Sequence, residues 1–282
     1  RLALTPWLNH SWHVTFRVTA RGLITPLIPN DGNDFQIEFD FIDHLLWLRT
    51  ANGTSQKIAL RPMSVAQFYA EYRQALSALK IDVEIDPMPN EVLSAIAFDQ
   101  DTTHASYDPE YANRHWRVLL RANEVFHYFR TAFLGKASPV QLFWGRFDLK
   151  VTRFSGRHAP RHPGGIPNLS DAVTREAYSH EESSCGFWPG GGAVDYPAFY
   201  SYAYPAPEGF GAAAVKPDAA FFHKELGEFI LPYDAVRTSA DPKQTLLDFL
   251  QSTYEAAADL AKWDRASLEC DFGERGTPRV VK

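Results

Sequence analysis

The sequence predicts an α+β protein with two pseudo-repeated antiparallel sheets, each followed by a helix. Apolar and polar residues alternate along several short segments, as they do in strands with one buried face. Other stretches repeat their apolar residues with the 3.6-residue period of a helix. The chain has 282 residues and is 45% apolar, which is enough for a sizeable buried core.

Four short antiparallel strands are expected at the start of the chain. Residues 14–20 and 35–41 alternate apolar and polar positions. Two more strands are expected at 45–50 and 57–60, because the Asn-Gly pair between them is typical of hairpin turns. These segments would form the first sheet.

Three segments carry the signals of longer helices. Ser64 is an expected N-cap with Gln67 three residues later, which is the capping-box pattern. The longest helix is expected to begin after Asp108 and to end near Gly135. Asp241, followed by a proline, is expected to cap the final helix.

The opening pattern recurs in the second half. Residues 147–152 alternate as residues 14–19 do, with a basic residue in the same slot and the same Val-Thr ending. A short helix at 170–178 and further strands are also expected, the strands at 81–85, 179–187, 198–204 and 228–231. The recurrence predicts an internal pseudo-repeat with a pseudo-twofold arrangement, helices on one face of the sheets, and a helix upstream of Arg1.

The expected organisation is a single α+β domain built of two halves. The halves would span about residues 1–106 and 107–270, and residues 271–282 would form a flexible tail because they contain glycine and proline near a chain end. The two cysteines, Cys185 and Cys270, are too few for a disulfide scaffold and suit a reducing cytoplasm.

Charge excludes two classes of partner. The chain has 34 acidic and 28 basic residues and a net charge of −6, so no positive field is expected that would hold nucleic acid or an anionic membrane surface. No apolar run approaches the roughly 20 residues that a bilayer span needs.

The first polar cluster lies in the N-terminal half. His10, His13, Glu38 and His44 are residue types that hold zinc, and strand pairing would bring some of them onto one sheet face. They lack the helix-borne spacing of a metalloprotease, and a solvated face with cross-strand charge pairs is the favoured explanation. We therefore predict no metal and no cofactor, with these four residues as the candidates if a metal is bound.

The second cluster precedes a triple glycine in the second half. His180 beside Glu181 or Glu182 could serve as a general base oriented by a carboxylate, and His180 and Glu181 are the predicted catalytic residues. Tyr178 and Trp188 are predicted to bind a ligand, with Trp188 part of an aromatic lid beside the glycines. Ordinary strand packing and a glycine-rich turn are the alternative explanation.

The third cluster is a charged strand and the loop after it. Arg146 and Asp148 alternate onto one face, and Arg153 and Arg157 follow. All four are predicted ligand-binding residues, because such a surface could hold an anionic small molecule. A purely structural network of charges is the alternative.

Several of these segments resemble a bacterial family known only as a domain of unknown function. The resemblance extends over nearly the whole chain and is clearest at residues 8–13, 38–44, 138–157 and 177–190. It implies family membership and brings no activity, cofactor or catalytic residue with it.

Two functions of different classes follow from these observations. The first is a cytoplasmic protein that binds a small molecule in a cleft between its halves, with acid–base or hydrolytic chemistry. The second is a non-catalytic interaction or structural module that uses an aromatic sheet face, which would make the protein an oligomer. Aromatic residues form 14% of the chain and serve either function.

Overall fold

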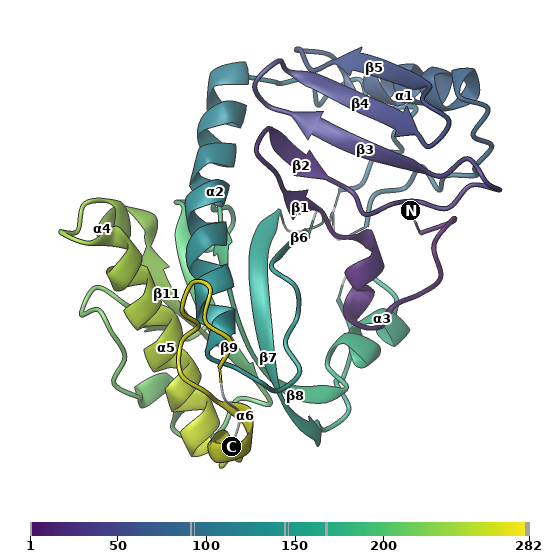
Figure 1. Ribbon diagram of the computed structural model, residues 1–282. Helices are drawn as coiled ribbons and strands as arrows, with labels where there is room; N and C mark the ends of the chain where they lie inside the picture. Colours follow the sequence, from purple (N-terminus) through teal and green to yellow (C-terminus); the bar gives the residue numbers. More distant parts are fainter. Residues whose placement is uncertain are drawn as a thin grey trace. The chain divides into compact units, whose positions relative to one another are not determined.

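The computed structural model describes residues 2–90, 92, 94–143, 145, 147–166 and 169–279. The chain forms two compact units: unit 1 is Arg1–Leu120 with Pro163–Glu176, and unit 2 is Arg121–His162 with Ala177–Lys282. Each unit contains one antiparallel sheet, which confirms the α+β class (Figure 1). The single domain with halves at 1–106 and 107–270 and a tail at 271–282 stays a prediction, as does the pseudo-repeat.

Within the described residues, unit 1 holds a five-stranded sheet in the order β1-β2-β3-β4-β5. The strands are β1 (Arg17–Val18), β2 (Gly22–Ile24), β3 (Phe35–Asp40), β4 (Leu45–Thr50) and β5 (Ser55–Ala59). Helix α1 (Val65–Ala78) packs on one face, where Leu76 joins the buried Leu46 and Leu48. It begins as predicted, because the Ser64 side chain accepts a hydrogen bond from the backbone amide of Gln67.

Unit 2, over its described residues, holds a six-stranded sheet in the order β10-β11-β9-β8-β7-β6. Its strands are β6 (Gln141–Phe143), β7 (Asp148–His158), β8 (His180–Trp188), β9 (Ala198–Tyr204), β10 (Phe221–His223) and β11 (Glu228–Pro232). Helix α5 (Pro242–Leu260) packs on β8 and β9. Asp241 caps it, as predicted, by accepting hydrogen bonds from the amides of Lys243 and Gln244.

The other helices are η1 (Asn9–Val14), α2 (Pro109–Thr131), α3 (Asp171–Ala177), η2 (Phe210–Ala212), α4 (Tyr233–Arg237) and α6 (Arg265–Leu268). Helix α2 is the longest of them, and its residues belong partly to unit 1 and partly to unit 2. Among the described residues, none of the helices combines the length and the apolar character that crossing a bilayer requires.

The sheet of unit 2 has two chemically different faces, because successive strand residues point to opposite sides. One face packs on helices: Phe199 of β9 contacts Phe126 of α2 with 6.4 Å between ring centroids. The other face carries most of the polar side chains and three tyrosines from alternate positions of β9. We call it the tyrosine face and define it by Asp148, Lys150, Thr152, Glu182, Ser184, Trp188, Tyr200, Tyr202 and Tyr204.

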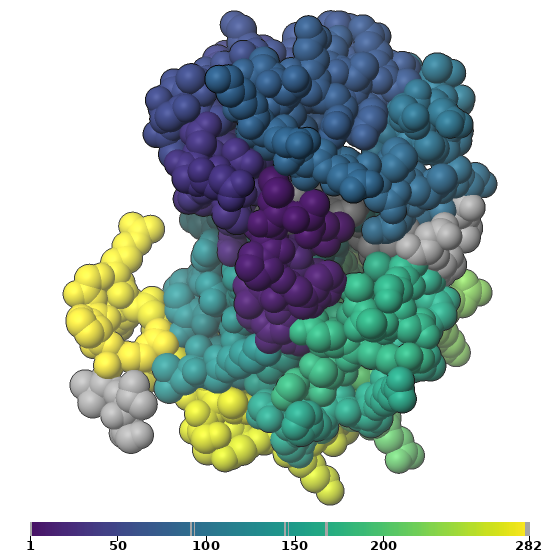
Figure 2. All heavy atoms as spheres, turned by 90° about the vertical axis from the view of Figure 1, so that its right-hand side faces the viewer, coloured from purple at the N-terminus to yellow at the C-terminus, as the bar shows by residue number. Residues whose placement is uncertain are grey.

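The strand predicted at 14–20 is largely wrong. Pairing there is limited to a bridge at Phe16 and to Arg17–Val18. Upstream, His10 and Ser11 take left-handed backbone conformations, with φ of 58° each, and the chain coils into η1, which ends at Val14. In the space-filling view this N-terminal segment (purple) lies beside the green residues around α3 (Figure 2), and the His10 amide donates to Glu176 at 2.8 Å. The segment before the predicted strand is therefore held by a contact distant in sequence.

Other boundaries also differ from the prediction. Residues 81–85 form no strand. Ile81 is instead buried in the core that α1 covers. Helix α2 ends at Thr131 rather than near Gly135, and the Leu134 amide instead donates to the carbonyl of Leu268 at 2.7 Å. Helix α6 follows α5, so the helix capped by Asp241 is not the last.

Candidate functional site

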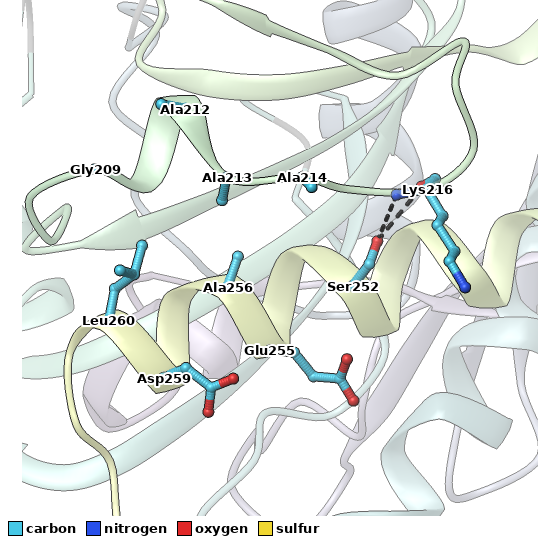
Figure 3. Close-up of a pocket in the computed structure, with 10 residues that line it drawn as sticks. All are labelled: Gly209, Ala212, Ala213, Ala214, Lys216, Ser252, Glu255, Ala256, Asp259 and Leu260. Atoms are coloured by element: carbon cyan, nitrogen blue, oxygen red, sulfur yellow. Dashed lines mark hydrogen bonds between the residues drawn. The ribbon is translucent and has the colours of Figure 1, made fainter.

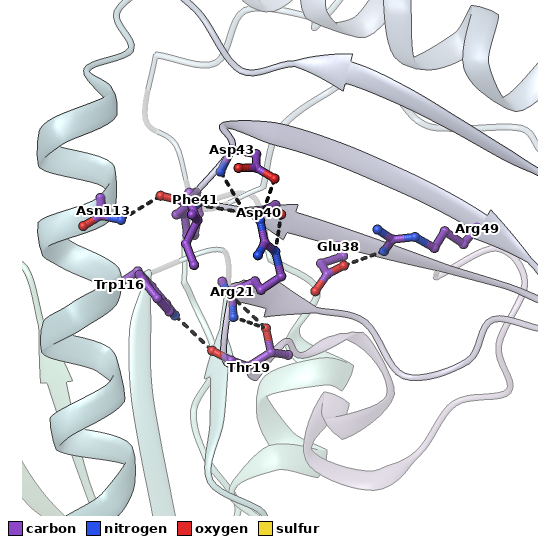
Figure 4. A network of polar contacts seen from close by, with 11 residues as sticks. Thr19, Arg21, Glu38, Asp40, Phe41, Asp43, Arg49, Asn113 and Trp116 are labelled. Carbon is purple, nitrogen blue, oxygen red and sulfur yellow. Dashed lines mark hydrogen bonds and ion pairs between the residues drawn. The ribbon is translucent and has the colours of Figure 1, made fainter.

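Three acidic residues of β3 and the turn after it, Glu38, Asp40 and Asp43, are held in ion pairs (Figure 4). Arg21 lies 2.6 Å from both Asp40 and Asp43 through two of its nitrogens. Burial raises the pKa of Asp40, but hydrogen bonds from Arg21 and from the amides of Asp43 and Ile42 outweigh it, so the pKa lies below its ordinary value. This network ties neighbouring strand ends together.

The candidate metal ligands of unit 1 have other partners. Glu38 forms an ion pair with Arg49, and His44 Nδ1 lies 2.9 Å from the hydroxyl of Tyr107. His10 stacks on Trp12, and His13 Nδ1 accepts a hydrogen bond from the Leu8 amide. Among the described residues, no three His, Cys, Asp or Glu side chains gather as a metal site would require.

The predicted catalytic pair occupies consecutive positions of β8, so its members point to opposite faces. Glu181 points away from the tyrosine face and accepts hydrogen bonds from Ser155 at 2.9 Å and from Arg157 at 2.6 Å. His180 shares the face of Glu182, two residues along the strand. The structure therefore separates His180 from Glu181, and the catalytic roles given to them stay predictions.

The predicted ligand-binding residues are divided between surfaces. Asp148 and Trp188 belong to the tyrosine face, and the Tyr178 hydroxyl donates to the Tyr202 hydroxyl at 3.4 Å. Arg157 is exposed and also donates to the carbonyls of residues 261 and 262. Arg146 lies outside the described residues.

Arg153 belongs to the core. It is 1% exposed on the helix-packed face, opposite to the face of Asp148. Its guanidinium carbon lies 3.5 Å from the ring centroid of Phe129 and 4.3 Å from that of Tyr254, and it donates to the Phe129 carbonyl. Burial lowers the pKa of Arg153 to about 10. The aromatic rings thus surround this cation inside unit 2.

Glu182 is the central acidic residue of the tyrosine face. It is 5% exposed, and its Oε1 accepts a hydrogen bond from the Tyr202 hydroxyl at 3.2 Å. Burial raises the pKa of Glu182 to about 7, against the opposing effects of Lys150, of the Tyr202 hydrogen bond and of Lys136. Since Tyr202 accepts from Tyr178, a chain of hydroxyls leads to this carboxyl.

A second carboxylate on the same face is also bonded to a tyrosine. The Tyr200 hydroxyl donates a short hydrogen bond to Asp148. Burial, followed by the effects of Asp148, raises the pKa of Tyr200 well above its ordinary value. Gly186 makes this contact feasible, because a Cβ at that position would lie 2.5 Å from the Tyr200 hydroxyl.

Sequence reasoning named Glu182 only as an alternative partner of His180, and it missed Tyr200 and Tyr202 as site residues. The signal that could have found them is the period of two in β9, where tyrosine occupies three alternate positions. The pairing of β8 with β9, which brings Glu182 to these tyrosines, appears only in the fold.

A shallow groove of about 400 Å³ lies elsewhere in unit 2, between α5 and the segment around η2 (Figure 3). Small residues form much of its wall, and Ser252 accepts a hydrogen bond from the Lys216 amide at 2.9 Å. Its acids, Glu255 and Asp259, both pair with Arg265. The groove is therefore hollow enough to hold a ligand, but its two carboxylates are already paired with an arginine.

The chain is thus an α+β protein whose candidate acid–base site is the tyrosine face of the sheet in unit 2. The chain belongs to a family of unknown function, DUF5996, whose model matches residues 1–270. No curated protein and no solved structure matches it. The family confirms the resemblance found in the sequence, and the chemistry must be argued from the residues themselves.

Proposed function

We propose that unit 2 binds a small molecule on the tyrosine face and that Glu182 acts there as a general acid or base. The observation that carries this proposal is a carboxyl only 5% exposed whose hydrogen bond comes from a tyrosine rather than an arginine. With a pKa of about 7, Glu182 is present in both protonation states at neutral pH, as general acid–base catalysis requires. Such shifts are concentrated at functional sites.

The surroundings of Glu182 suit an organic ligand. Tyr178 and Trp188 are half-buried and offer ring surfaces, while the hydroxyls of Tyr178 and Tyr202 can exchange hydrogen bonds. The hydroxyl chain from Tyr178 through Tyr202 gives the carboxyl a route for its proton. The chemistry is proton transfer to or from the ligand, and it needs no cofactor.

Two measurements test this function. Carbon-13 NMR of glutamate-labelled protein should show one carboxyl that titrates near pH 7 and is missing in Glu182→Gln. A thermal-shift screen of small hydroxylated and carboxylated metabolites should find compounds that stabilise the wild type and the exposed control Glu208→Gln more than they stabilise Glu182→Gln. The proposal is overturned if the Glu182 carboxyl titrates in the ordinary range and no compound distinguishes the variants.

A second candidate function is a non-catalytic module that uses the same face to contact a second copy of this chain. Its support is an apolar cluster there, in which Trp188 packs on the buried Val194, Tyr200 and Ile230. Light scattering decides this case. A dimer that Trp188→Ser dissociates favours the module, and a monomer at all concentrations contradicts it.

The proposed location is the cytoplasm. Cys185 and Cys270 are both free thiols, which suits a reducing compartment. Fractionation of the native host's cells tests this directly.

A further inference from the structure

We infer that the ligand of the tyrosine face carries an oxyanion, a phosphate or a carboxylate, which Lys136, His158 and His180 hold at one end of this face. The inference rests on the proposed function, because it names the chemical class of the ligand for the same face.

A bulge in β7 brings the two histidines together. The register with β8 shifts between Phe154 and His158, where Gly156 has a φ of 85° that favours glycine. After the shift His158 pairs directly with His180, and their ring centroids are 4.6 Å apart. Two imidazoles from neighbouring strands thus stand side by side, on the face that Glu182 occupies.

Lys136 adds a third basic group. Its ammonium lies 4.7 Å from the ring centroid of Phe154, which is the strand partner of Glu182. Burial lowers the pKa of His180, and the charges of His158 and Lys136 lower it further. The three groups therefore repel one another when charged, and an oxyanion between them would relieve that repulsion.

The other groups around His180 leave room for this role. Ser179 lies 3.0 Å from His180 Nδ1 and can share a hydrogen bond with it. Glu181 points to the opposite face and pairs with Arg157, while Glu182 is bonded to Tyr202. Nearby, His162 stacks its ring on Tyr178 and tilts against Tyr204.

An oxyanion would be bound together with protons. A negative charge next to an imidazole favours its protonated form, so binding raises the pKa of both histidines and becomes tighter as the pH falls. Because His180 and Glu182 are two residues apart on one face, the anionic group would anchor a ligand whose remaining atoms reach the carboxyl.

Sulfate is the first probe, because its charge stays constant between pH 6 and pH 8. Titration calorimetry on the full chain, with ionic strength fixed by sodium chloride, should give affinity at pH 6 that falls by at least about ten-fold at pH 8. The fall should persist in Glu182→Gln, because the wild-type carboxyl also ionises in this range and the histidines alone lose protons in the variant. Inorganic phosphate and acetate, tested at pH 6, distinguish a phosphate-like ligand from a carboxylate.

Variants assign the binding to these residues. The double variant His158→Asn/His180→Asn and the single variant Lys136→Met should each lose at least about ten-fold in sulfate affinity, while His223→Asn on β10 should lose none. Glu182→Gln should keep sulfate binding, so a failure of the acid–base proposal is distinguishable from a failure of this inference.

Three results overturn the inference: no sulfate binding at pH 6 beyond that of chloride, equal affinity at both pH values, or unchanged affinity in the double variant. If the double variant does not fold, histidine NMR of the wild type replaces it. Sulfate must then raise the pKa of both His158 and His180, and an unchanged titration rejects the site.

Discussion

Asp40 in unit 1 and Glu182 in unit 2 are both almost fully buried carboxylates on antiparallel sheets, with exposures of 2% and 5%. Their pKa values nevertheless move in opposite directions. Asp40 accepts hydrogen bonds from the Arg21 guanidinium and from two backbone amides, whereas Glu182 accepts one from the Tyr202 hydroxyl. Burial raises the pKa of both carboxyls and desolvates Glu182 more strongly; at Asp40 the arginine and the two amides outweigh it, whereas at Glu182 the tyrosine hydrogen bond and the nearby lysines do not.

The comparison separates a structural role from a chemical one. A carboxylate paired with arginine stays ionised and holds strand ends together. A carboxyl surrounded by tyrosines destabilises the fold when it ionises, but it is ready to exchange a proton near neutral pH. The following predictions test this difference, beginning with the largest effect.

Glu182→Gln should stabilise the protein at high pH. As the pH rises through 4.5, the unfolded chain loses the Glu182 proton, while the folded state keeps it until about pH 7. The wild type therefore loses stability over this range and the variant does not. The difference in unfolding free energy should shift in favour of the variant by about 3 kcal/mol between pH 4 and pH 8, measured by urea denaturation.

Asp40→Asn should change the pH dependence of the unfolding free energy in the opposite direction. The lowered pKa of Asp40 gives stability that is present above the ordinary range of aspartate and disappears as the pH falls through the folded value. By urea denaturation, the variant should be less stable than the wild type at pH 7. The difference in unfolding free energy between the two should become smaller at acidic pH. The same pH trend in both variants would contradict the comparison.

Gly186→Ala should disturb the second tyrosine–carboxylate pair. The added Cβ would lie 2.5 Å from the Tyr200 hydroxyl and 2.7 Å from the Leu149 carbonyl, so Tyr200 must move away from Asp148. Overpacking of this kind costs about 2 kcal/mol. Adding Tyr200→Phe removes one of the clashing atoms, so the double variant should lose less than the sum of the single variants; simple additivity would reject the contact.

Tyr202→Phe should push the pKa of Glu182 above about 7. The Tyr202 hydrogen bond lowers this pKa, so its removal leaves the effect of burial less opposed. We expect a stability loss of about 1 kcal/mol at pH 8, where the carboxyl is ionised and loses its donor. NMR titration of the labelled carboxyl is the measurement, and a lower pKa in the variant would contradict the arrangement.

Paired cap variants compare the two units as folding units. Ser64→Ala removes the N-cap of α1 in unit 1, and Asp241→Ala removes that of α5 in unit 2, each at a cost of about 1 kcal/mol. If the units unfold separately, each variant shifts only one of two calorimetric transitions. A single transition shifted by both supports the predicted single domain.

Local signals located most elements. The Asn-Gly turn marked the β4–β5 hairpin, and the caps at Ser64 and Asp241 marked α1 and α5, because these signals depend on a few neighbouring residues. The prediction largely failed at 14–20, where an alternating pattern yields only the short strand β1 directly after the coil of η1. Alternation alone does not say how long a strand will be.

In the candidate site, too, some features follow from the sequence and others only from the fold. The sequence alone determined the α+β class, the family and the concentration of polar and aromatic residues around 178–188. The tertiary structure decided that Glu181 pairs with Arg157, that Arg153 lies in the core, and that Glu182 lies beside Tyr202. The physical reason is that a strand's alternation says which residues share a face, while only the pairing of strands says which partners each side chain meets.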